Sequence, residues 1–134
     1  MRDERKRILL VDDSDVIRHF LGDMLRVGGE FDVDTAINGR VALDMLNKDR
    51  YNALLVDMNM PFMSGIELYR CVERTYPEMA TKVVFMSLDI PDPKTRSFFT
   101  KVNRPFLLKP FTIDDLMNAF RNCVVGREAG SPDG

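Results

Sequence analysis

The sequence predicts an α/β fold in which helices cover both faces of a doubly wound parallel sheet. Two observations support this prediction: five short apolar runs alternate with five helical periodicities, and most of the runs are apolar at every position. Strands buried on both faces have such continuous runs, and alternating strands and helices build parallel sheets. The length of 134 residues suits one domain of this kind.

The predicted strands follow the apolar runs in chain order. Residues 8–11, 53–56 and 83–86 are continuously apolar, as expected for central strands. Residues 31–35 alternate between apolar and polar, which suits an edge strand with one polar face. Residues 106–108 form the fifth predicted strand.

Turn and capping signals delimit the first three predicted helices. The pair Gly28-Gly29 ends the first helix and Asn38 starts the second. Ser64 precedes Glu67 by three residues, a capping-box pattern that opens the third helix. The first helix has six apolar residues at helical spacing, which are Val16, Ile17, Phe20, Leu21, Met24 and Leu25.

Two more helices are predicted in the second half of the chain. A short fourth helix carries Phe98 and Phe99 after a proline-marked loop, and Thr112 with Asp115 can cap the last helix. The last helix is expected to face the core with Ile113, Leu116, Met117, Phe120, Cys123 and Val124.

Composition disfavours several classes of protein. Nineteen Lys and Arg against 21 Asp and Glu give a formal net charge of −2, which argues against a nucleic-acid binder. No apolar run approaches the roughly 18 residues of a membrane span, and the charged N-terminus does not resemble a signal peptide. Cys71 and Cys123 lie far apart and His19 is the single histidine, so a disulfide framework or a zinc site has no support. A cytoplasmic location is therefore expected. Residues 1–125 form the predicted domain, and residues 126–134, without an apolar cluster, a flexible tail or linker.

The candidate functional residues follow the predicted strands at their carboxyl ends, where open α/β sheets bind ligands. Asp12 and Asp13 follow the first strand, Asp57 the third, Ser87 the fourth and Lys109 the fifth. Each has a simpler explanation when taken alone: a helix cap, a turn residue, a loop hydroxyl or a solvated surface cation. Their occurrence together at one edge of the sheet favours a functional site.

Magnesium is the cofactor that this set of residues predicts. Clustered carboxylates repel one another unless a cation lies among them, and Mg²⁺ prefers oxygen ligands. Three aspartates, one lysine and one Mg²⁺ give a site of near-zero formal charge, which suits phosphoryl transfer. An aspartate carboxylate can then act as the nucleophile and form an acyl phosphate.

The sequence resembles the receiver domains of two-component response regulators over residues 7–125. The matching stretches, in the order and spacing of that family, are Leu10-Val11-Asp12-Asp13-Ser14, Leu55-Val56-Asp57-Met58-Asn59-Met60-Pro61, Met63-Ser64-Gly65, Ser87 and Lys109-Pro110-Phe111. The resemblance implies a flavodoxin-like (βα)5 three-layer sandwich with a five-stranded parallel sheet in the order 2-1-3-4-5. It extends to chemotaxis regulators and, at residues 87–110, to receivers fused to hybrid sensor histidine kinases.

The resemblance implies a phosphoacceptor and a set of metal ligands. Asp57 would accept the phosphoryl group. Asp12 and Asp13 would bind Mg²⁺ together with the Asp57 carboxylate and the backbone carbonyl of Asn59.

The resemblance also implies how the phosphoryl group is held and sensed. The Lys109 ammonium and the Ser87 hydroxyl would contact the phosphoryl oxygens, and the Lys109–Pro110 bond would be cis. Ser87 and Phe106 would form the switch, in which the hydroxyl moves toward the phosphoryl group and the aromatic ring changes rotamer. Phe106 has no hydroxyl, so it would act through packing alone, and an ordinary apolar strand residue is the alternative. Leu88 is larger than the residue usual at this position in the family, and we expect it to narrow the access of water to Asp57.

Three hypotheses for the function follow. The first is a signalling module, not an enzyme with a separate substrate, that takes a phosphoryl group from the phosphohistidine of a sensor histidine kinase. Its output would lie in a downstream protein or output domain, with neither nucleic acid nor membrane as a partner, and phosphorylation could also promote a homodimer. The second is an aspartate-nucleophile phosphatase or phosphotransferase, which would need a second Asp where this chain has Asn59. The third is a phosphate-independent interaction domain, disfavoured because every site position is filled.

Overall fold

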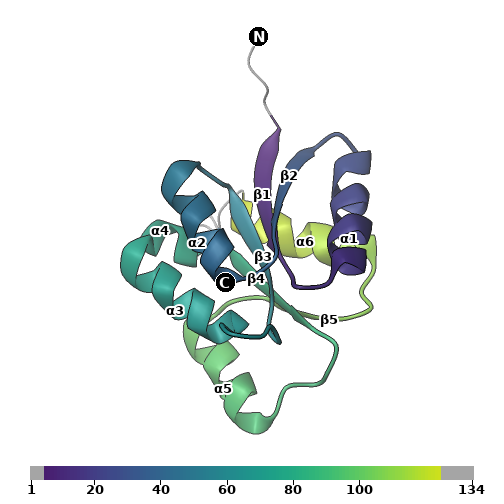
Figure 1. Cartoon of the computed structure of the whole chain (residues 1–134). Coiled ribbons are helices and arrows are strands. Elements are labelled where there is room, and N and C mark those ends of the chain that lie inside the picture. Colours follow the sequence, from purple (N-terminus) through teal and green to yellow (C-terminus); the bar gives the residue numbers. More distant parts are fainter. Residues whose placement is uncertain (1–4, 125–134) are drawn as a thin grey trace.

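Five parallel strands form the middle layer of the molecule (Figure 1), and the computed structural model describes residues 5–124. The strand order is β2-β1-β3-β4-β5, the order that the resemblance implies. The strands are β1 (Lys6–Val11), β2 (Phe31–Ala36), β3 (Ala53–Asp57), β4 (Val83–Ser87) and β5 (Phe106–Leu108). Because all five run in the same direction, their carboxyl ends lie along one edge of the sheet.

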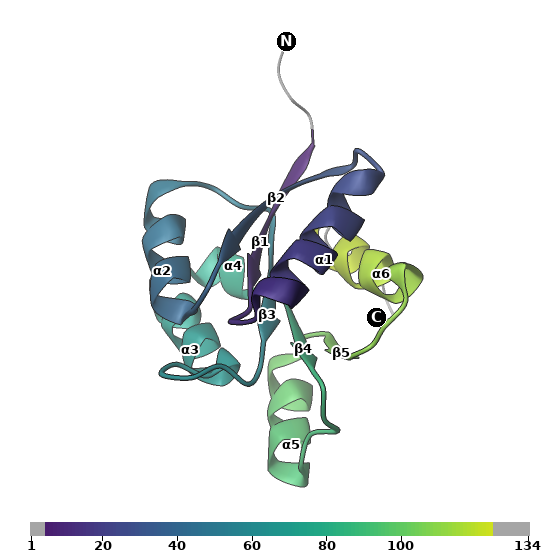
Figure 2. The same cartoon turned by 45° about the vertical axis from the view of Figure 1, so that its right-hand side comes forward.

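Helices cover both faces of the sheet (Figure 2). The helices are α1 (Asp15–Val27), α2 (Gly39–Lys48), α3 (Gly65–Thr75), α4 (Pro77–Ala80), α5 (Pro93–Val102) and α6 (Ile113–Val124). The alternation of side chains along β1 divides the core: Leu9 packs in a cluster with residues of α2 to α5, while Ile8 and Leu10 pack with residues of α1 and α6. The three-layer sandwich is therefore confirmed.

The predicted capping signals all operate in the structure. The side chain of Asn38 accepts from the Val41 amide at the start of α2. Ser64 and Glu67 form a complete capping box on α3, and Thr112 and Asp115 exchange the equivalent pair of hydrogen bonds at α6.

Several sequence-based expectations are wrong in detail. The cap of α1 is Ser14, whose hydroxyl accepts from the Ile17 amide, which rules out the alternative in which Asp12 or Asp13 serves only as that cap. An additional helix, α4, has only four residues, too few to show a helical period. The predicted short fourth helix corresponds to α5, which has ten residues, as many as α2.

Three of the apolar side chains that mark the predicted helices are exposed, and only Ile113 among them is expected from the sequence to face the core. Val16 and Phe20 in α1 and Ile113 in α6 face solvent. A helix packed on a sheet buries only a stripe of its surface, and in α1 that stripe runs through Leu21 and Leu25. At about 100° per residue, Phe20 lies about 100° to 140° and Val16 about 140° to 180° around the helix from these two leucines, which places both outside the contact.

The remaining expectations on the chain ends lie outside the described part. The predicted tail at residues 126–134 and the boundary at residue 125 are outside it, as are the side chains of Cys123 and Val124. Within residues 5–124, no helix has the length and apolar character needed to span a membrane.

Candidate functional site

The carboxyl edge of the sheet brings three aspartates together. Val11 and Val56 are register partners in the adjacent strands β1 and β3, so the residues that follow them, Asp12 and Asp57, emerge side by side. One carboxylate oxygen from each of Asp12, Asp13 and Asp57 lies within 4.8 Å of the others. Asp12 is 1% exposed and Asp57 is 5% exposed, whereas Asp13 faces solvent.

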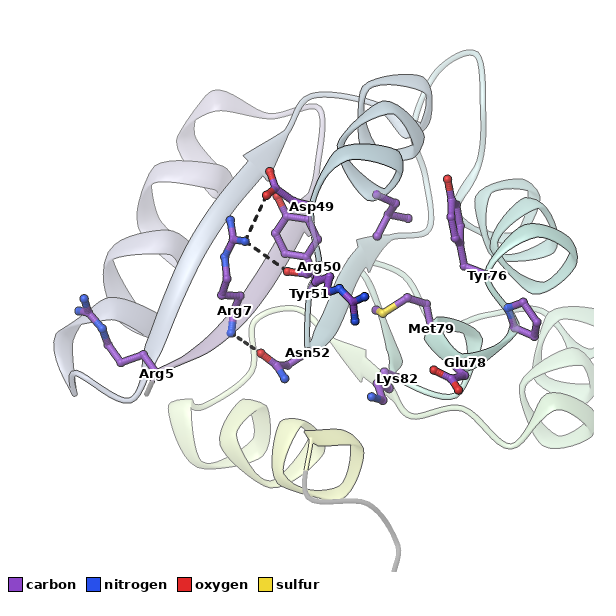
Figure 3. A pocket seen from close by; sticks show the side chains of 12 residues that line it. Arg5, Arg7, Asp49, Arg50, Tyr51, Asn52, Tyr76, Glu78, Met79 and Lys82 are labelled. Atoms are coloured by element: carbon purple, nitrogen blue, oxygen red, sulfur yellow. Dashed lines mark hydrogen bonds and ion pairs between the residues drawn. The ribbon is translucent and has the colours of Figure 1, made fainter. Parts of the chain in front are cut away.

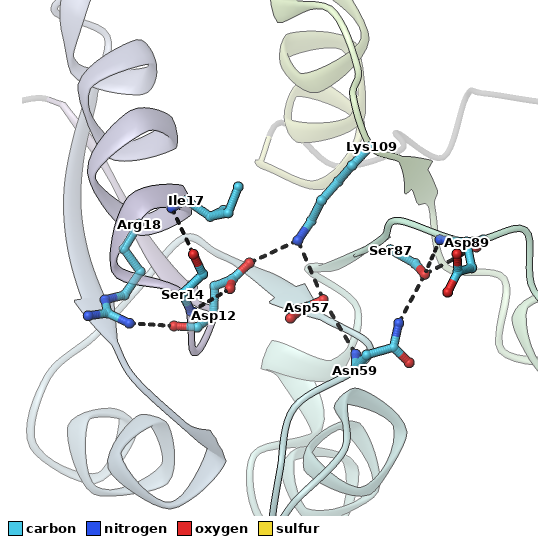
Figure 4. A network of polar contacts seen from close by, with 9 residues as sticks. All are labelled: Asp12, Ser14, Ile17, Arg18, Asp57, Asn59, Ser87, Asp89 and Lys109. Atoms are coloured by element: carbon cyan, nitrogen blue, oxygen red, sulfur yellow. Dashed lines mark hydrogen bonds and ion pairs between the residues drawn. The ribbon is translucent and has the colours of Figure 1, made fainter.

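Lys109 supplies the positive charge of this cluster (Figure 4). Its Nζ lies 3.0 Å from Asp12 Oδ2 and 3.6 Å from Asp57 Oδ1, and its side chain is only 10% exposed. The Lys109 amide also donates to the Ser87 carbonyl, 2.7 Å away, which ties the end of β5 to the end of β4. The Lys109–Pro110 bond is cis, as expected. Lys109 is thus a buried counter-ion and not a solvated surface cation.

The loop after β1 holds Asp12 in a fixed orientation. The Ser14 amide donates to Asp12 Oδ1 at 2.9 Å, and the Arg18 guanidinium donates to the Asp12 carbonyl oxygen at 2.8 Å. Asp12 Oδ2 meets Lys109, so both carboxylate oxygens of this buried side chain are engaged.

The environment of Asp57 raises the pKa of its carboxyl group. Burial and the nearby Asp12 carboxylate raise the pKa of Asp57 to about 6, against opposing contributions from Lys109 and from the Asn59 backbone amide, while exposed Asp13 raises it further. The negative form of Asp57 is therefore under-compensated by the protein alone, since one ammonium stands against three carboxylates.

Ser87 lies at the end of β4 and is also buried. Its hydroxyl donates to the Asp89 carbonyl at 3.1 Å and accepts from the Asp89 amide at 3.1 Å and from Asn59 Nδ2 at 3.2 Å. Figure 4 shows this network beside Asp57. The contact between Asn59 and Ser87 is not encoded in any sequence pattern, because it depends on the rotamer of an exposed amide.

The donor set fits a hard divalent cation. The three aspartates offer only oxygen ligands, and two of them are buried where repulsion between their charges is strongest. The Asn59 amide donates to Asp57 Oδ1 at 3.4 Å, which keeps this loop against the carboxylate cluster. A hollow of about 350 Å³ opens onto Asp12, Asp13 and Asp57 beside Lys109 and Leu88.

Residues 8–121 match the response regulator receiver domain family. The chain belongs to this family. Its parallel sheet in the order 2-1-3-4-5 and its aspartate cluster at the carboxyl edge are the features that the resemblance of the sequence implies.

The receiver domain resembles proteins of several kinds. It is 30% identical over 115 residues to the response regulator MprA of Mycolicibacterium vanbaalenii, covering 86% of this chain and 48% of that protein. The response regulator TrrA of Thermotoga maritima, solved in complex with Mg(2+)-BeF, superposes with a TM-score of 0.76 at 28% identity, over 88% of this chain and 98% of that one. The receiver domain of a signal transduction histidine kinase from Syntrophus aciditrophicus superposes with a TM-score of 0.76 at 25% identity, over 92% of this chain and 93% of that one.

The curated relatives are longer than this chain and differ in the activity that accompanies the receiver domain. The chain spans about half or less of the length of the curated relatives that it matches first. The relatives include regulators of transcription and a protein-glutamate methylesterase, so the family is constant while the attached activity differs.

Phe106 of the receiver packs against α5. Its ring stacks on Phe99 with centroids 4.8 Å apart and an interplanar angle of 26°, and it is half-buried. Ser87 and Phe106 line a common hollow of about 250 Å³, together with Asn59 and the loop before α5. Ser87 and Phe106, the two residues predicted to form a switch, therefore line the same hollow.

A second, larger hollow lies at the amino edge of the sheet (Figure 3). It has a volume of about 750 Å³ and lies among β1, the end of α2, the start of β3 and α4. Arg7 is the centre of its polar contacts: the guanidinium meets Asp34 at 2.8 Å and Asp49 at 3.5 Å and lies 4.8 Å from the ring centroid of Tyr51. The Tyr51 hydroxyl donates to Asp34 at 2.6 Å. Each of the two carboxylates, Asp34 and Asp49, therefore lies within ion-pair distance of the Arg7 guanidinium.

Proposed function

We propose that the receiver accepts a phosphoryl group on Asp57 from the phosphohistidine of a sensor histidine kinase. The observation that carries this proposal is the position of the Asp57 carboxylate, buried between a second buried aspartate and the ammonium of Lys109. An aspartate in this setting is under-compensated until further positive charge joins the site.

The transfer is a displacement at phosphorus. A carboxylate oxygen of Asp57 forms the new O–P bond, the N–P bond of the phosphohistidine breaks, and the electron pair of that bond returns to the imidazole nitrogen. Lys109, now shared between Asp12 and Asp57, is placed to compensate charge on the phosphoryl oxygens as they arrive. The acceptor needs no general base, because it reacts as the carboxylate.

Asp12, Asp13 and Asp57, with the backbone carbonyl of Asn59, would hold Mg²⁺. When bound, the ion supplies charge neutralisation for the transferred group. The related receiver TrrA, solved with Mg(2+)-BeF, supports this assignment.

The signal would leave the site through Ser87 and Phe106. In the present structure the Ser87 hydroxyl is engaged by Asn59 and Asp89, so contact with a phosphoryl group on Asp57 requires those hydrogen bonds to break. A turn of Phe106 into the adjoining hollow would then change its stacking on Phe99 and the surface of α5.

The protein would act in the cytoplasm as a module that assists only its own phosphorylation and dephosphorylation. Its output would come from a downstream protein or an output domain, or from a homodimer formed on phosphorylation, because the family members compared carry different activities beyond the receiver.

Mass spectrometry after incubation with acetyl phosphate and Mg²⁺ tests the proposal. The wild type is expected to gain a covalent adduct of about 80 Da that maps to Asp57 and is lost in EDTA-treated samples. Asp57→Asn is expected to gain none, and Asp44→Asn, at an exposed aspartate of α2, serves as the control that keeps the adduct. An adduct that persists in Asp57→Asn contradicts the assignment.

A further inference from the structure

Phe62 is an apolar side chain that the fold itself does not use. It lies in the loop between β3 and α3 and is 98% exposed. Its φ of +70° is in the left-handed region, and the Met63 amide donates to the Pro61 carbonyl at 2.7 Å, which closes a three-residue γ-turn around it. A bulky residue is strained there, and burial of the ring provides no compensation.

Other positions with positive φ show what the fold prefers. In residues 5–124 these are Gly29 and Asn103, which end helices α1 and α5 and belong to the residue types that tolerate this conformation. Phe62 is the exception among them. A strained residue that packs against nothing is most simply retained for contact with another molecule.

The loop presents Phe62 in a fixed position. Met60 on one side is buried, and Met63 on the other packs against the core. The Gly65 amide donates to the Met58 carbonyl at 3.1 Å, and a Cβ at Gly65 would lie 2.7 Å from the Asp57 carbonyl oxygen. The segment that displays Phe62 is thus attached at both ends next to the backbone of Asp57.

Exposed apolar side chains recur around the whole phosphorylation edge. Each of the five segments that follow a strand contributes at least one, at positions Val16, Ile37, Phe62, Leu88, Ile90 and Ile113. Leu88, 68% exposed, also borders the hollow that opens onto Asp57 and Lys109. Because Asp57 is 5% exposed, a protein that delivers a phosphoryl group to it has to settle closely over these loops. A small phosphodonor has no such need.

We propose that Phe62 is the anchor with which this receiver docks the phosphohistidine-bearing donor protein, its ring seated in an apolar recess beside the donor's histidine. The inference rests on the proposed function and adds the surface by which the donor is recognised. Aromatic side chains that become buried in a pocket of the partner are frequent hot spots of protein interfaces.

Phe62→Gly separates docking from folding and from chemistry. Glycine relieves the γ-turn, so this variant is expected to melt at or above the wild-type temperature. Phosphorylation by acetyl phosphate and Mg²⁺ is expected at the wild-type rate, because Phe62 does not contact the carboxylate cluster. A panel of purified, autophosphorylated histidine kinases is then tested on the wild type, and the kinase that phosphorylates it fastest is chosen. Phosphoryl transfer from this kinase is measured for each variant.

With that kinase, kcat/KM is expected to fall at least about tenfold for Phe62→Gly, mainly through KM. Phe62→Tyr keeps the ring and is expected to retain most of the rate. Val27→Ala, at an exposed apolar residue at the far end of α1, is the matched control and is expected to leave the rate unchanged.

If the kinase phosphorylates Phe62→Gly with the same kcat/KM as the wild type, the inference is overturned. An equal loss with acetyl phosphate would also overturn it, since Phe62 would then affect the chemistry at Asp57. If the wild type takes a phosphoryl group neither from acetyl phosphate nor from any kinase, the proposed function itself fails. If acetyl phosphate alone modifies Asp57, the acceptor stands and the docking of a kinase is wrong.

Discussion

The two edges of the sheet differ in how far their charges are buried and balanced, since the side chains of Arg7 and of its ion-pair partners at the amino edge are all more than a third exposed. At the amino edge, Arg7 pairs with Asp34 and Asp49, and Tyr51 donates to Asp34, so each charge meets an opposite charge or a donor. At the carboxyl edge, three carboxylates surround one ammonium, and the pKa of Asp57 rises to about 6 through burial and the charge of Asp12.

Under the proposed function, this difference separates a structural cluster from a functional one. Charges that are paired within the protein do not need a bound ion to compensate them. A cluster that is left with excess negative charge lowers stability and is stabilised when a cation binds to it. The amino edge has the larger hollow, yet the carboxyl edge has the unbalanced charge.

Removal of the central cation at each edge should have the largest effect. Without divalent cations, Lys109→Met is expected to lower the free energy of unfolding by about 3 kcal/mol, because two buried carboxylates lose their partner. Arg7→Met is expected to cost only about 1 kcal/mol, because its ion pairs are more than a third exposed and weakened by solvent. Urea denaturation measures both values, and equal losses would refute the contrast between the edges.

Magnesium should distinguish the same two variants. Relative to the wild type at the same Mg²⁺ concentration, saturating Mg²⁺ is expected to reduce the loss in Lys109→Met, whose cluster lacks its ammonium. The loss in Arg7→Met is expected to stay the same, because Mg²⁺ stabilises this variant and the wild type equally.

Neutralisation of Asp57 should stabilise the metal-free protein. The pKa of Asp57 is raised from 3.8 to about 6 in the folded state, so between these values the folded protein binds more protons than the unfolded chain. Its contribution to stability is therefore present below pH 4 and is lost as the pH rises through 6. At pH 7 without Mg²⁺, Asp57→Asn is expected to gain about 2 kcal/mol relative to the wild type, and little at pH 4. Denaturation curves at the two pH values check this, and a variant without a pH-dependent gain would contradict it.

A single hydrogen bond at the amino edge should have a smaller and purely structural effect. Tyr51→Phe removes the donor to Asp34 and is expected to lower the free energy of unfolding by about 1 kcal/mol. The rate of phosphorylation by acetyl phosphate should not change. A slower rate in this variant would show that the two edges are coupled.

The smallest expected effect concerns the lifetime of the acyl phosphate. Leu88 lies beside the hollow over Asp57, and Leu88→Ala is expected to admit water and speed hydrolysis by about threefold, which is well under 1 kcal/mol in barrier height. The rate at which the adduct of about 80 Da disappears measures this effect. Identical decay in wild type and variant would remove Leu88 as a barrier.

The sequence predicted which residues lie together at the carboxyl edge, because strand ends are easy to locate. Asp12, Asp57, Ser87 and Lys109 each end or follow an apolar run, and parallel strands place such residues on one edge. The cis bond before Pro110 and the roles of Asn59 and Phe106 came from the family resemblance, not from the residues alone.

What the sequence did not predict depends on packing in three dimensions. Periodicity groups Val16 and Phe20 with the apolar face of α1, but the width of the contact with the sheet decides which members are buried. Helix α4 is shorter than any detectable period. The γ-turn at Phe62 violates the residue preference for positive φ, so no local rule could have predicted it.

The most direct test of the contrast between the edges is a ¹⁵N chemical-shift titration with Mg²⁺ followed by beryllofluoride. We predict shifts at the amides of Asp12, Asp13, Asp57, Asn59, Ser87 and Lys109, enlarged and extended to Phe106 by beryllofluoride, with Arg7, Tyr51 and Asn52 unchanged. Absence of a response at the carboxyl edge, or a response centred on Arg7 and Tyr51, would contradict the account.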